Sequence, residues 1–385
     1  MSDAVLPPEL LDYILDLLHN EPETLKRCCL VTKSWVPRTR RYIFADIGFY
    51  SSRSLKSWSN TFTDPTNSPA LHVRTLAFDC YPEELKGADW IRSFSSVVHL
   101  RLTGHPILSF PLFHGFARNL KTLYVRFIEF SCPELFNFIY SFPLLENLSL
   151  HSERVLEDDE NDFHNLKTSP LLTGSLKLVS FGGLGSAPRY LLSLPNGLRF
   201  RELMFSLIQE DDLRWIKELV LGCSDTLECL DVKYKWSGTY NFWFHSGGVV
   251  NHLRFAGTPD PIDLSKATKL KFLIFRLRTL GCRRVLAMLE TITAEHRDLR
   301  QVSIHLPYKR IPRGNAAYFR FYLGSDLYEK WLELDRLLVY LSESRSIRPR
   351  VVITESMGPT LVIKDLISHL FPEITARGLI DLAEE

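Results

Sequence analysis

The 385-residue sequence contains no apolar run close to the roughly 18–20 residues that a helix needs to cross a bilayer. Its first residues, MSDAVLPPELLDYILDLLHNEPE, carry acids early and lack a basic segment, so we expect no secretory signal peptide. The seven cysteines are odd in number and form no CxxC pair, which argues against a disulfide framework. These absences indicate a soluble protein of the cytoplasm or nucleus with reduced, mostly buried thiols.

An excess of one charge is also missing, because 46 basic and 45 acidic residues leave a formal net charge of +1. This balance argues against a protein whose main ligand is a nucleic-acid backbone or an anionic membrane. The sequence has no GxGxxG, P-loop, HExxH or GxSxG motif, and no Cys/His cluster with zinc spacing. We therefore expect no enzymatic activity, metal or cofactor. An active site assembled from residues distant in the sequence is the alternative.

The N-terminal region has the pattern of three short helices. Apolar residues recur at helical spacing from Leu10 to Leu18, after two prolines that suit a first helical turn. Asn20, with Glu23 three positions later, predicts the cap of a second helix. A third helical segment follows, in which Pro37 marks either a kink or a fresh start. So much apolar surface on about fifty residues is typical of a unit that binds a partner.

The strings LPPELLDYILDLL and TLKRCCLVTKSWVPRTRRYIFADI closely resemble the F-box, over about residues 6–47. The resemblance implies that these helices dock onto the Skp adaptor of a cullin–RING (SCF-type) ubiquitin ligase. By position, the residues that would make or support that contact are Leu6, Pro7, Leu11, Ile14, Leu15 and Trp35. The alternative is a helical cap that only covers the end of a repeat domain.

Beyond residue 72 a six-residue pattern recurs, with apolar residues at its first, fourth and sixth positions. The ten matches are Val73/Leu76/Phe78, Val97/Leu100/Leu102, Leu120/Leu123/Val125, Leu145/Leu148/Leu150, Leu176/Val179/Phe181, Phe200/Leu203/Phe205, Leu227/Leu230/Val232, Val250/Leu253/Phe255, Leu270/Leu273/Phe275 and Leu299/Val302/Ile304. Their middle residues are 20–31 positions apart, close to the period of leucine-rich repeats. Helical patterns at 133–142, 211–222 and 283–296 lie between matches.

These observations predict an α/β chain in which a three-helix F-box precedes an irregular leucine-rich-repeat-like solenoid with parallel strands. We assign residues 1–50 to the F-box helices, 51–72 to a joint, and 73–385 to the solenoid with its C-terminal cap. This arrangement resembles F-box receptors that are abundant in fungi. An ordinary α/β domain is the alternative, although it would not need ten nearly equal units.

Residues between the apolar positions of a strand point away from the core, onto the concave face of a solenoid. That face would hold the substrate-binding candidates, which are Arg101, Tyr124, Arg126, His151, Lys233, Arg254 and Arg276. Exposed polar residues on strands also occur without any function. The segment 299–325 has five basic residues, several aromatic ones and no acid. It suits nucleic acid or an acidic degron, and equally a solvated loop.

The resemblance and the repeat together predict a substrate receptor, with the Skp adaptor on the helices, cullin and RING subunits bound through it, and a protein substrate on the solenoid. Such a chain would act by raising the local concentration of substrate near the ligase. The second hypothesis is a scaffold that uses the solenoid without joining a ligase.

Overall fold

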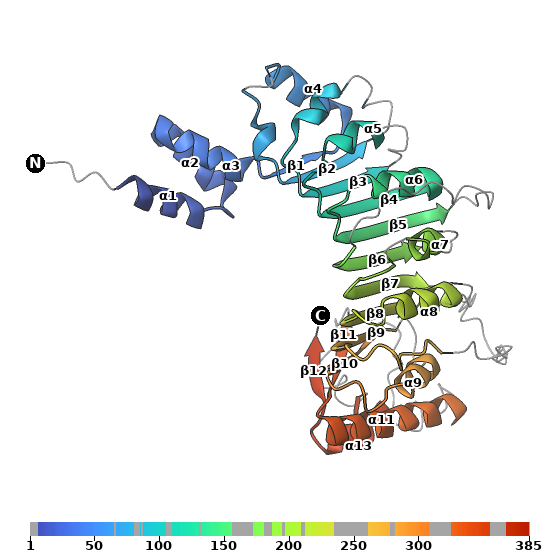
Figure 1. Cartoon of the computed structure of the whole chain (residues 1–385). Coiled ribbons are helices and arrows are strands. Elements are labelled where there is room, and N and C mark those ends of the chain that lie inside the picture. Colours follow the sequence, from blue (N-terminus) through green and yellow to red (C-terminus); the bar gives the residue numbers. More distant parts are fainter. Residues whose placement is uncertain are drawn as a thin grey trace, which may run out of the picture. The chain divides into compact units, whose positions relative to one another are not determined.

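The computed structural model is an α/β chain of parallel strands joined by helices and loops (Figure 1). The structure describes residues 7–64, 67–80, 85, 88–104, 110–116, 118–130, 132–155, 172–180, 187–194, 197–208, 212–234, 261–277, 282–307, 325–354 and 367–384. The chain divides into two compact units, Met1–Leu172 (unit 1) and Thr173–Glu385 (unit 2).

Unit 1 begins with a helical module (residues 7–43) that consists of α1 (Pro8–Leu17), α2 (Pro22–Val31), the short 3₁₀ turn η1 (Lys33–Trp35) and α3 (Val36–Ile43). Pro8 and Pro22 stand in the first turns of their helices, where a missing N–H costs nothing. The predicted Asn20 cap is wrong, since Glu21 is the N-cap residue and makes no side-chain cap bond. The reason is a turn in which Glu21 N donates to Leu18 O at 2.8 Å, with Asn20 inside it.

The strands of unit 1 are neighbours in chain order and pair in parallel: β1 (Asp46–Phe49), β2 (Thr75–Cys80), β3 (His99–Gly104), β4 (Thr122–Phe130) and β5 (Asn147–Val155). The elements between them are α4 (Ser52–Thr61), η2 (Pro69–His72), η4 (Asp89–Ser93), α5 (Phe110–Phe113), η6 (His114–Phe116) and α6 (Cys132–Tyr140). The sheet thus starts at Asp46, inside the range 1–50 that we assigned to helices. The predicted joint 51–72 contains α4, whose start is fixed by a capping box of Ser51 and Ser54.

Unit 2 continues the same alternation with β6 (Ser175–Ser180), β7 (Glu202–Ile208), β8 (Cys229–Tyr234), β9 (Phe272–Arg276), β10 (Gln301–Pro307), β11 (Arg348–Thr354) and β12 (Asp381–Glu384). Its helices are α7 (Ala187–Leu192), α8 (Leu213–Gly222), α9 (Arg283–Leu289), α11 (Ser325–Arg345) and α13 (Pro372–Ala376). The parallel α/β arrangement confirms the predicted fold class at this level. The helices predicted at 211–222 and 283–296 are α8 and the shorter α9.

One backbone contact recurs where successive strands begin. Two consecutive N–H groups donate to a single carbonyl of the preceding repeat, as when Val98 N and His99 N both donate to Arg74 O at 2.8 and 3.0 Å. The equivalent pairs at Lys121/Thr122, Glu146/Asn147, Arg201/Glu202, Glu228/Cys229, Lys271/Phe272 and Arg300/Gln301 do the same. This equivalence of backbone positions supports a repeating, solenoid-like arrangement within each unit.

The inward-facing apolar residues of the strands form rows, because parallel pairing in register places equivalent residues side by side. Leu76, Leu100, Leu123 and Leu148 make one such row in unit 1, and each is at most 1% exposed. In unit 2 the predicted central residue of β6 is wrong. Leu176, not Val179, pairs with Leu203. The sequence of β6 allows either residue to be the central inward one, and the register with the neighbouring strand selects Leu176.

The predicted match at Val250/Leu253/Phe255 falls between β8 and β9 in the sequence. β8 pairs directly with β9, with Leu230 opposite Leu273, so these two strands are neighbours in the sheet of unit 2. Residues 235–260 lie outside the described residues.

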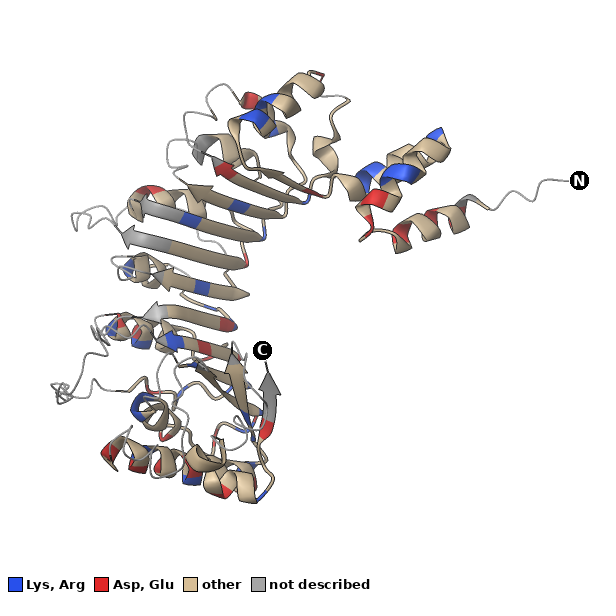
Figure 2. Cartoon of the chain, turned by 180° about the vertical axis from the view of Figure 1, so that it is seen from behind, with Lys and Arg blue, Asp and Glu red and all other residues tan. Residues whose placement is uncertain are grey.

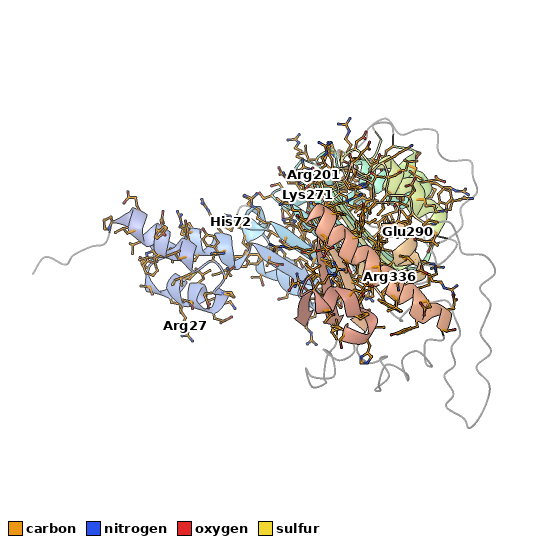
Figure 3. The ribbon with its side chains drawn as sticks, turned by 90° about the horizontal axis from the view of Figure 1, so that it is seen from below. Arg27, His72, Arg201, Lys271, Glu290 and Arg336 are labelled. Carbon is orange, nitrogen blue, oxygen red and sulfur yellow. The ribbon has the colours of Figure 1, made fainter. Side chains whose placement is uncertain are left out.

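An aromatic cluster joins the helical module to the first strands of the sheet. Trp58 of α4 is its centre and lies 4.6 Å from the Phe62 ring, 5.7 Å from Phe49 and 6.2 Å from Phe44, between ring centres. His72, which Figure 3 shows between the module and the sheet, is partly buried nearby. Burial lowers the pKa of His72, and the charges of Arg41 and Arg40 add to this effect.

Candidate partner-binding surfaces

The helical module exposes large apolar side chains along one side of α1. Leu10, Tyr13, Ile14 and Leu17 stand at positions i, i+3, i+4 and i+7 and are 44–63% exposed. We call these four residues the apolar stripe. At the C-terminal end of α2, Leu30 and Val31 are 87% and 68% exposed. Exposed apolar patches of this kind on a small helical unit mark a site of association.

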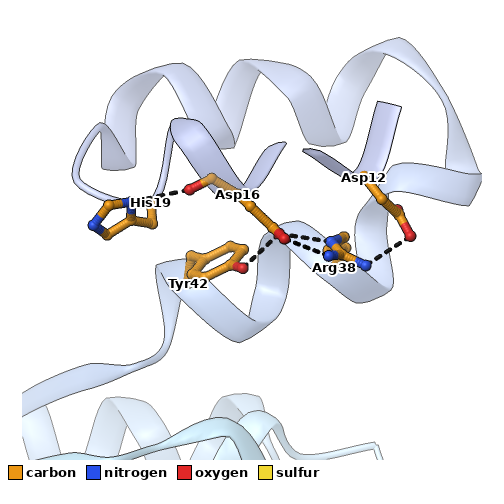
Figure 4. Close-up of polar contacts among 5 residues, drawn as sticks. All are labelled: Asp12, Asp16, His19, Arg38 and Tyr42. Carbon is orange, nitrogen blue, oxygen red and sulfur yellow. Dashed lines mark hydrogen bonds and ion pairs between the residues drawn. The ribbon is translucent and has the colours of Figure 1, made fainter. Parts of the chain in front are cut away.

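A polar brace holds α1 against α3 on a different side of α1 (Figure 4). The Arg38 guanidinium donates from Nη1 to Asp12 Oδ2 at 2.6 Å, and from Nε and Nη2 to the two oxygens of Asp16 at 2.7 and 2.5 Å. Tyr42 Oη also donates to Asp16 Oδ1 at 2.5 Å. These hydrogen bonds, with the nearby charges of Arg38 and Arg41, lower the pKa of Asp16 to about 2. The stripe is therefore carried by a helix whose other side is fixed.

The structure separates the predicted adaptor contacts into exposed and supporting residues. Pro7 and Ile14 are exposed and Leu11 is half-buried, so all three are accessible to a partner. Leu15 is only 1% exposed and lies in the module's core, so it can support the contact but does not itself face a partner. The cause is helical spacing, because neighbouring positions 14 and 15 point in different directions.

Two other predicted contacts have different outcomes. Trp35 is half-buried in η1, and its Nε1–H is buried without an acceptor among the residues that the structure describes. Leu6 lies outside the described residues. The structure also exposes apolar residues that the sequence did not single out as candidates, which are Leu10, Tyr13, Leu17, Leu30 and Val31.

In each unit the connecting helices lie on one side of the strands, which leaves an open face on the other side (Figure 1). On unit 1 this face brings together four predicted residues from β3, β4 and β5. The guanidinium carbon of Arg101 lies 4.8 Å from the centre of the Tyr124 ring, and the His151 ring lies 4.7 Å from the same ring. Arg126 is exposed and in register with His151. Figure 2 shows the basic residues of these strands in blue.

On unit 2 the predicted residues are arranged differently. Arg276 and Lys233 are in register on neighbouring strands and both are half-buried. Arg276 Nε donates to both carboxylate oxygens of Asp231, at 2.9 and 3.1 Å, and Asp231 is 2% exposed. Arg254 lies outside the described residues.

Several outward strand positions of unit 2 are buried, contrary to the prediction of an exposed recognition face. Ser303 and His305 on β10 are 2% and 7% exposed. Gln301 of the same strand donates from Nε2 to Ser303 Oγ at 2.6 Å, so this longer side chain lies against the shorter one. Alternation along a strand gives the direction of a side chain but not its exposure.

Other chemistry has little support in the described residues. The part of the chain that the structure describes holds no group of three His, Cys, Asp or Glu side chains arranged for a metal ion. Burial raises the pKa of Cys223, Cys229 and Cys282 to about 12, so these thiols are poor nucleophiles. Among the described helices, none combines the length and apolar character needed to cross a membrane. Most of the basic segment 299–325 (residues 308–324) lies outside the described residues.

Comparison with known proteins adds no relative to these observations. No protein-family model matches the chain, and no curated protein matches it.

Proposed function

We propose that this chain is the substrate-recognition subunit of an SCF-type cullin–RING ubiquitin ligase. In this proposal the helical module is an F-box that docks the Skp adaptor, and the strand–helix units are degenerate leucine-rich repeats that hold a protein substrate. The chain itself performs no chemistry and contributes by bringing substrate and ligase together.

The observation that carries the proposal is the apolar stripe. A core residue of the same helix, Leu15, is 1% exposed, whereas Leu17 two positions away is 63% exposed. Surface helices of an isolated domain normally turn such residues inward, so a partner that covers the stripe accounts for its composition. The F-box resemblance at residues 6–47 supports the Skp adaptor as that partner.

The brace between Arg38 and Asp16 also supports docking at this place. Binding to a surface that is already ordered avoids the entropy of ordering it on contact. The brace joins α1 to α3 through four hydrogen bonds and leaves the stripe free.

Copurification of the full chain with recombinant Skp adaptor tests the proposal. The wild-type chain should bind, and Ile14→Glu with Leu17→Glu should lose about tenfold or more in affinity, as expected when central apolar contacts are replaced by charges. A matched control places glutamates at Leu221 and Tyr340, which are 53% and 56% exposed in unit 2. This control should bind like wild type.

Two results would contradict the proposal. One is a wild-type chain that fails to bind purified adaptor, and the other is a stripe variant that binds as well as the control. The scaffold hypothesis predicts the first result, because it needs neither adaptor nor cullin. Thermal unfolding of each variant shows that loss of binding is not loss of folding.

A further inference from the structure

The open face of unit 1 contains a cluster of three side chains from three successive strands. Arg101 of β3 is in register with Tyr124 of β4, and its guanidinium lies over the Tyr124 ring at 4.8 Å. On β5, His151 contacts the same ring at 4.7 Å and is held by a hydrogen bond between its Nε2 and Ser149 Oγ at 3.1 Å. A guanidinium held over an aromatic ring keeps its charge and its N–H donors, and a carboxylate can accept two of these hydrogen bonds.

Within the part of the chain that the structure describes, the two arginines of this face have no acidic partner. Neither Arg101 nor Arg126 lies within ion-pairing distance of a carboxylate among the residues that the structure describes, and both are exposed. Asp79 on β2 is the acid nearest in register, but Thr103 lies between it and Arg126. This strand surface therefore has two basic groups available to an external anion.

Unit 2 provides the contrast that makes this observation informative. Its open face also has in-register basic residues, but Arg276 is paired with Asp231 at 2.9 Å. Lys271, directly before β9, is paired with Glu228 at 2.8 Å. Internal pairing neutralises these two cations, whereas Arg101 and Arg126 have no such acidic partner among the described residues.

The spacing of Arg101 and Arg126 restricts the kind of anion. They stand on neighbouring strands and two positions apart along the strand, which places their Cα atoms roughly 8 Å from each other. Stacking on Tyr124 keeps the Arg101 guanidinium on its own side of the ring. In an extended peptide, side chains at alternate positions lie about 7 Å apart on one face. Two carboxylates at such positions match the two arginines better than one compact anion does.

We infer that the open face of β3–β5 binds an extended acidic segment of a partner protein, with unmodified Asp or Glu side chains at alternate positions. Arg101 binds one carboxylate, Arg126 binds the next, and Tyr124 lies between them as the positioning residue. The assignment of this surface as the binding site of a ligase substrate rests on the proposed function. The binding of an acidic peptide does not.

Fluorescence anisotropy with the full chain tests the inference. The probe is a labelled Gly/Ser peptide with four Glu residues at alternate positions. The comparison peptides have Gln in place of Glu, the four Glu in one block, or a single phosphoserine. The alternating-Glu peptide should bind most tightly of the four, and its affinity should fall as the salt concentration rises. The Gln peptide should not bind. Equal binding of the block peptide, or tighter binding of the phosphoserine peptide, would overturn the inference.

Variants identify the site. Arg101→Gln with Arg126→Gln should weaken binding about tenfold or more, because a hydrogen-bonded ion pair commonly contributes at least that factor. The matched control, Lys177→Gln with Arg348→Gln, removes two charges from outward strand positions of unit 2 and should change binding less than about twofold. Equal losses of peptide affinity in both double variants would show that the effect comes from net charge alone, and would reject the site.

The role of Tyr124 requires its own variants. Tyr124→Phe keeps the ring and should keep binding, whereas Tyr124→Leu removes the stacking surface and should weaken binding and reduce its salt dependence. A purely structural role of the ring predicts a loss without the change in salt dependence, and a role of the hydroxyl group alone predicts the same loss for both variants. The arginine variants should still bind the adaptor and the stripe variant should still bind the peptide, so failure of this inference is distinct from failure of the proposed function.

Discussion

Arg38 and Asp16 form a bidentate ion pair that joins α3 to α1, with Nε donating to Oδ1 at 2.7 Å and Nη2 to Oδ2 at 2.5 Å. Planar pairs of this kind fix orientation as well as distance, because both partners must lie in one plane. The pair therefore contributes to the orientation of α1, and with it to the direction of the apolar stripe.

Replacing Arg38 with Gln should loosen α1 from α3 while α2 stays in place. We expect faster amide hydrogen exchange in α1 and weaker adaptor binding, since the stripe would no longer be held in one orientation. Arg27→Gln is the matched control, because Arg27 is an exposed arginine of α2 (Figure 3). Unchanged exchange in α1 of the Arg38 variant would show that the brace does not hold the helix.

Acid should release the same brace. The pKa of Asp16 is lowered from 3.8 to about 2, first by the hydrogen bond from Arg38 and then by that from Tyr42. A carboxyl whose pKa is lowered in the folded state stabilises the fold above its unfolded pKa and loses this contribution as the pH falls through the folded value. Exchange in α1 should therefore rise between about pH 4 and 2. The Asp16→Asn variant should lack this step.

Leu15 and Leu17 should respond in opposite ways to truncation. Leu15→Ala should destabilise the module by about 2–5 kcal/mol, because it leaves a cavity in the core. Leu17→Ala should change stability by less than about 0.5 kcal/mol but weaken adaptor binding. Urea unfolding followed by circular dichroism, together with the adaptor assay, separates the two effects. Similar stability losses for both would contradict the assignment of core and contact.

Asp335 fastens α11 to α13 in unit 2. Its buried carboxylate accepts hydrogen bonds from Glu373 N at 2.7 Å and Ile374 N at 3.1 Å, at the start of α13. Asp335→Ala leaves these N–H groups without that acceptor and should cost about 1–3 kcal/mol. Asn retains an acceptor oxygen, so Asp335→Asn should cost less. A thermal midpoint unaffected by the Ala change would argue against this cap.

Residues 236–259 should be replaceable by a short Gly/Ser linker. β8 and β9 pair directly, with Cys229 opposite Phe272, so their register does not require a strand from the intervening chain. Loop closure depends weakly on length, so we expect the free energy of unfolding to change by only about 1 kcal/mol. Loss of the cooperative unfolding of unit 2 in the shortened chain would be evidence that the segment has a structural role.

Strand positions were well predicted where the apolar residues fit only one alternation of inward and outward side chains. The central leucines of β3, β4, β5, β7, β8 and β9 are buried as expected. In β6, apolar residues at 176, 178 and 179 satisfy two phases, and pairing with Leu203 selects one of them. Pairing is a contact between distant residues, so a local pattern does not contain it.

The site was predicted only in part for a related reason. Ile14 and Leu15 are equally apolar, and only the packing of α1 against α3 decides which is exposed. Arg101 and Arg276 both occupy outward strand positions, but the acid that neutralises Arg276 is 45 positions away in the sequence. Sequence spacing thus identified candidate residues, whereas their exposure and charge state depend on partners that folding brings close.

The repeated pairing of β2–β5 has a consequence for how this part of the chain folds. Each strand pairs with the next one along the chain, about 25 positions away. The loop between two paired strands can therefore close before the other strands have paired. Repeat proteins of this kind fold by growth from a local nucleus, with stability contributed mainly by neighbouring repeats. A substitution that destabilises one repeat should therefore disorder the adjacent repeats most and the repeats several strands away least.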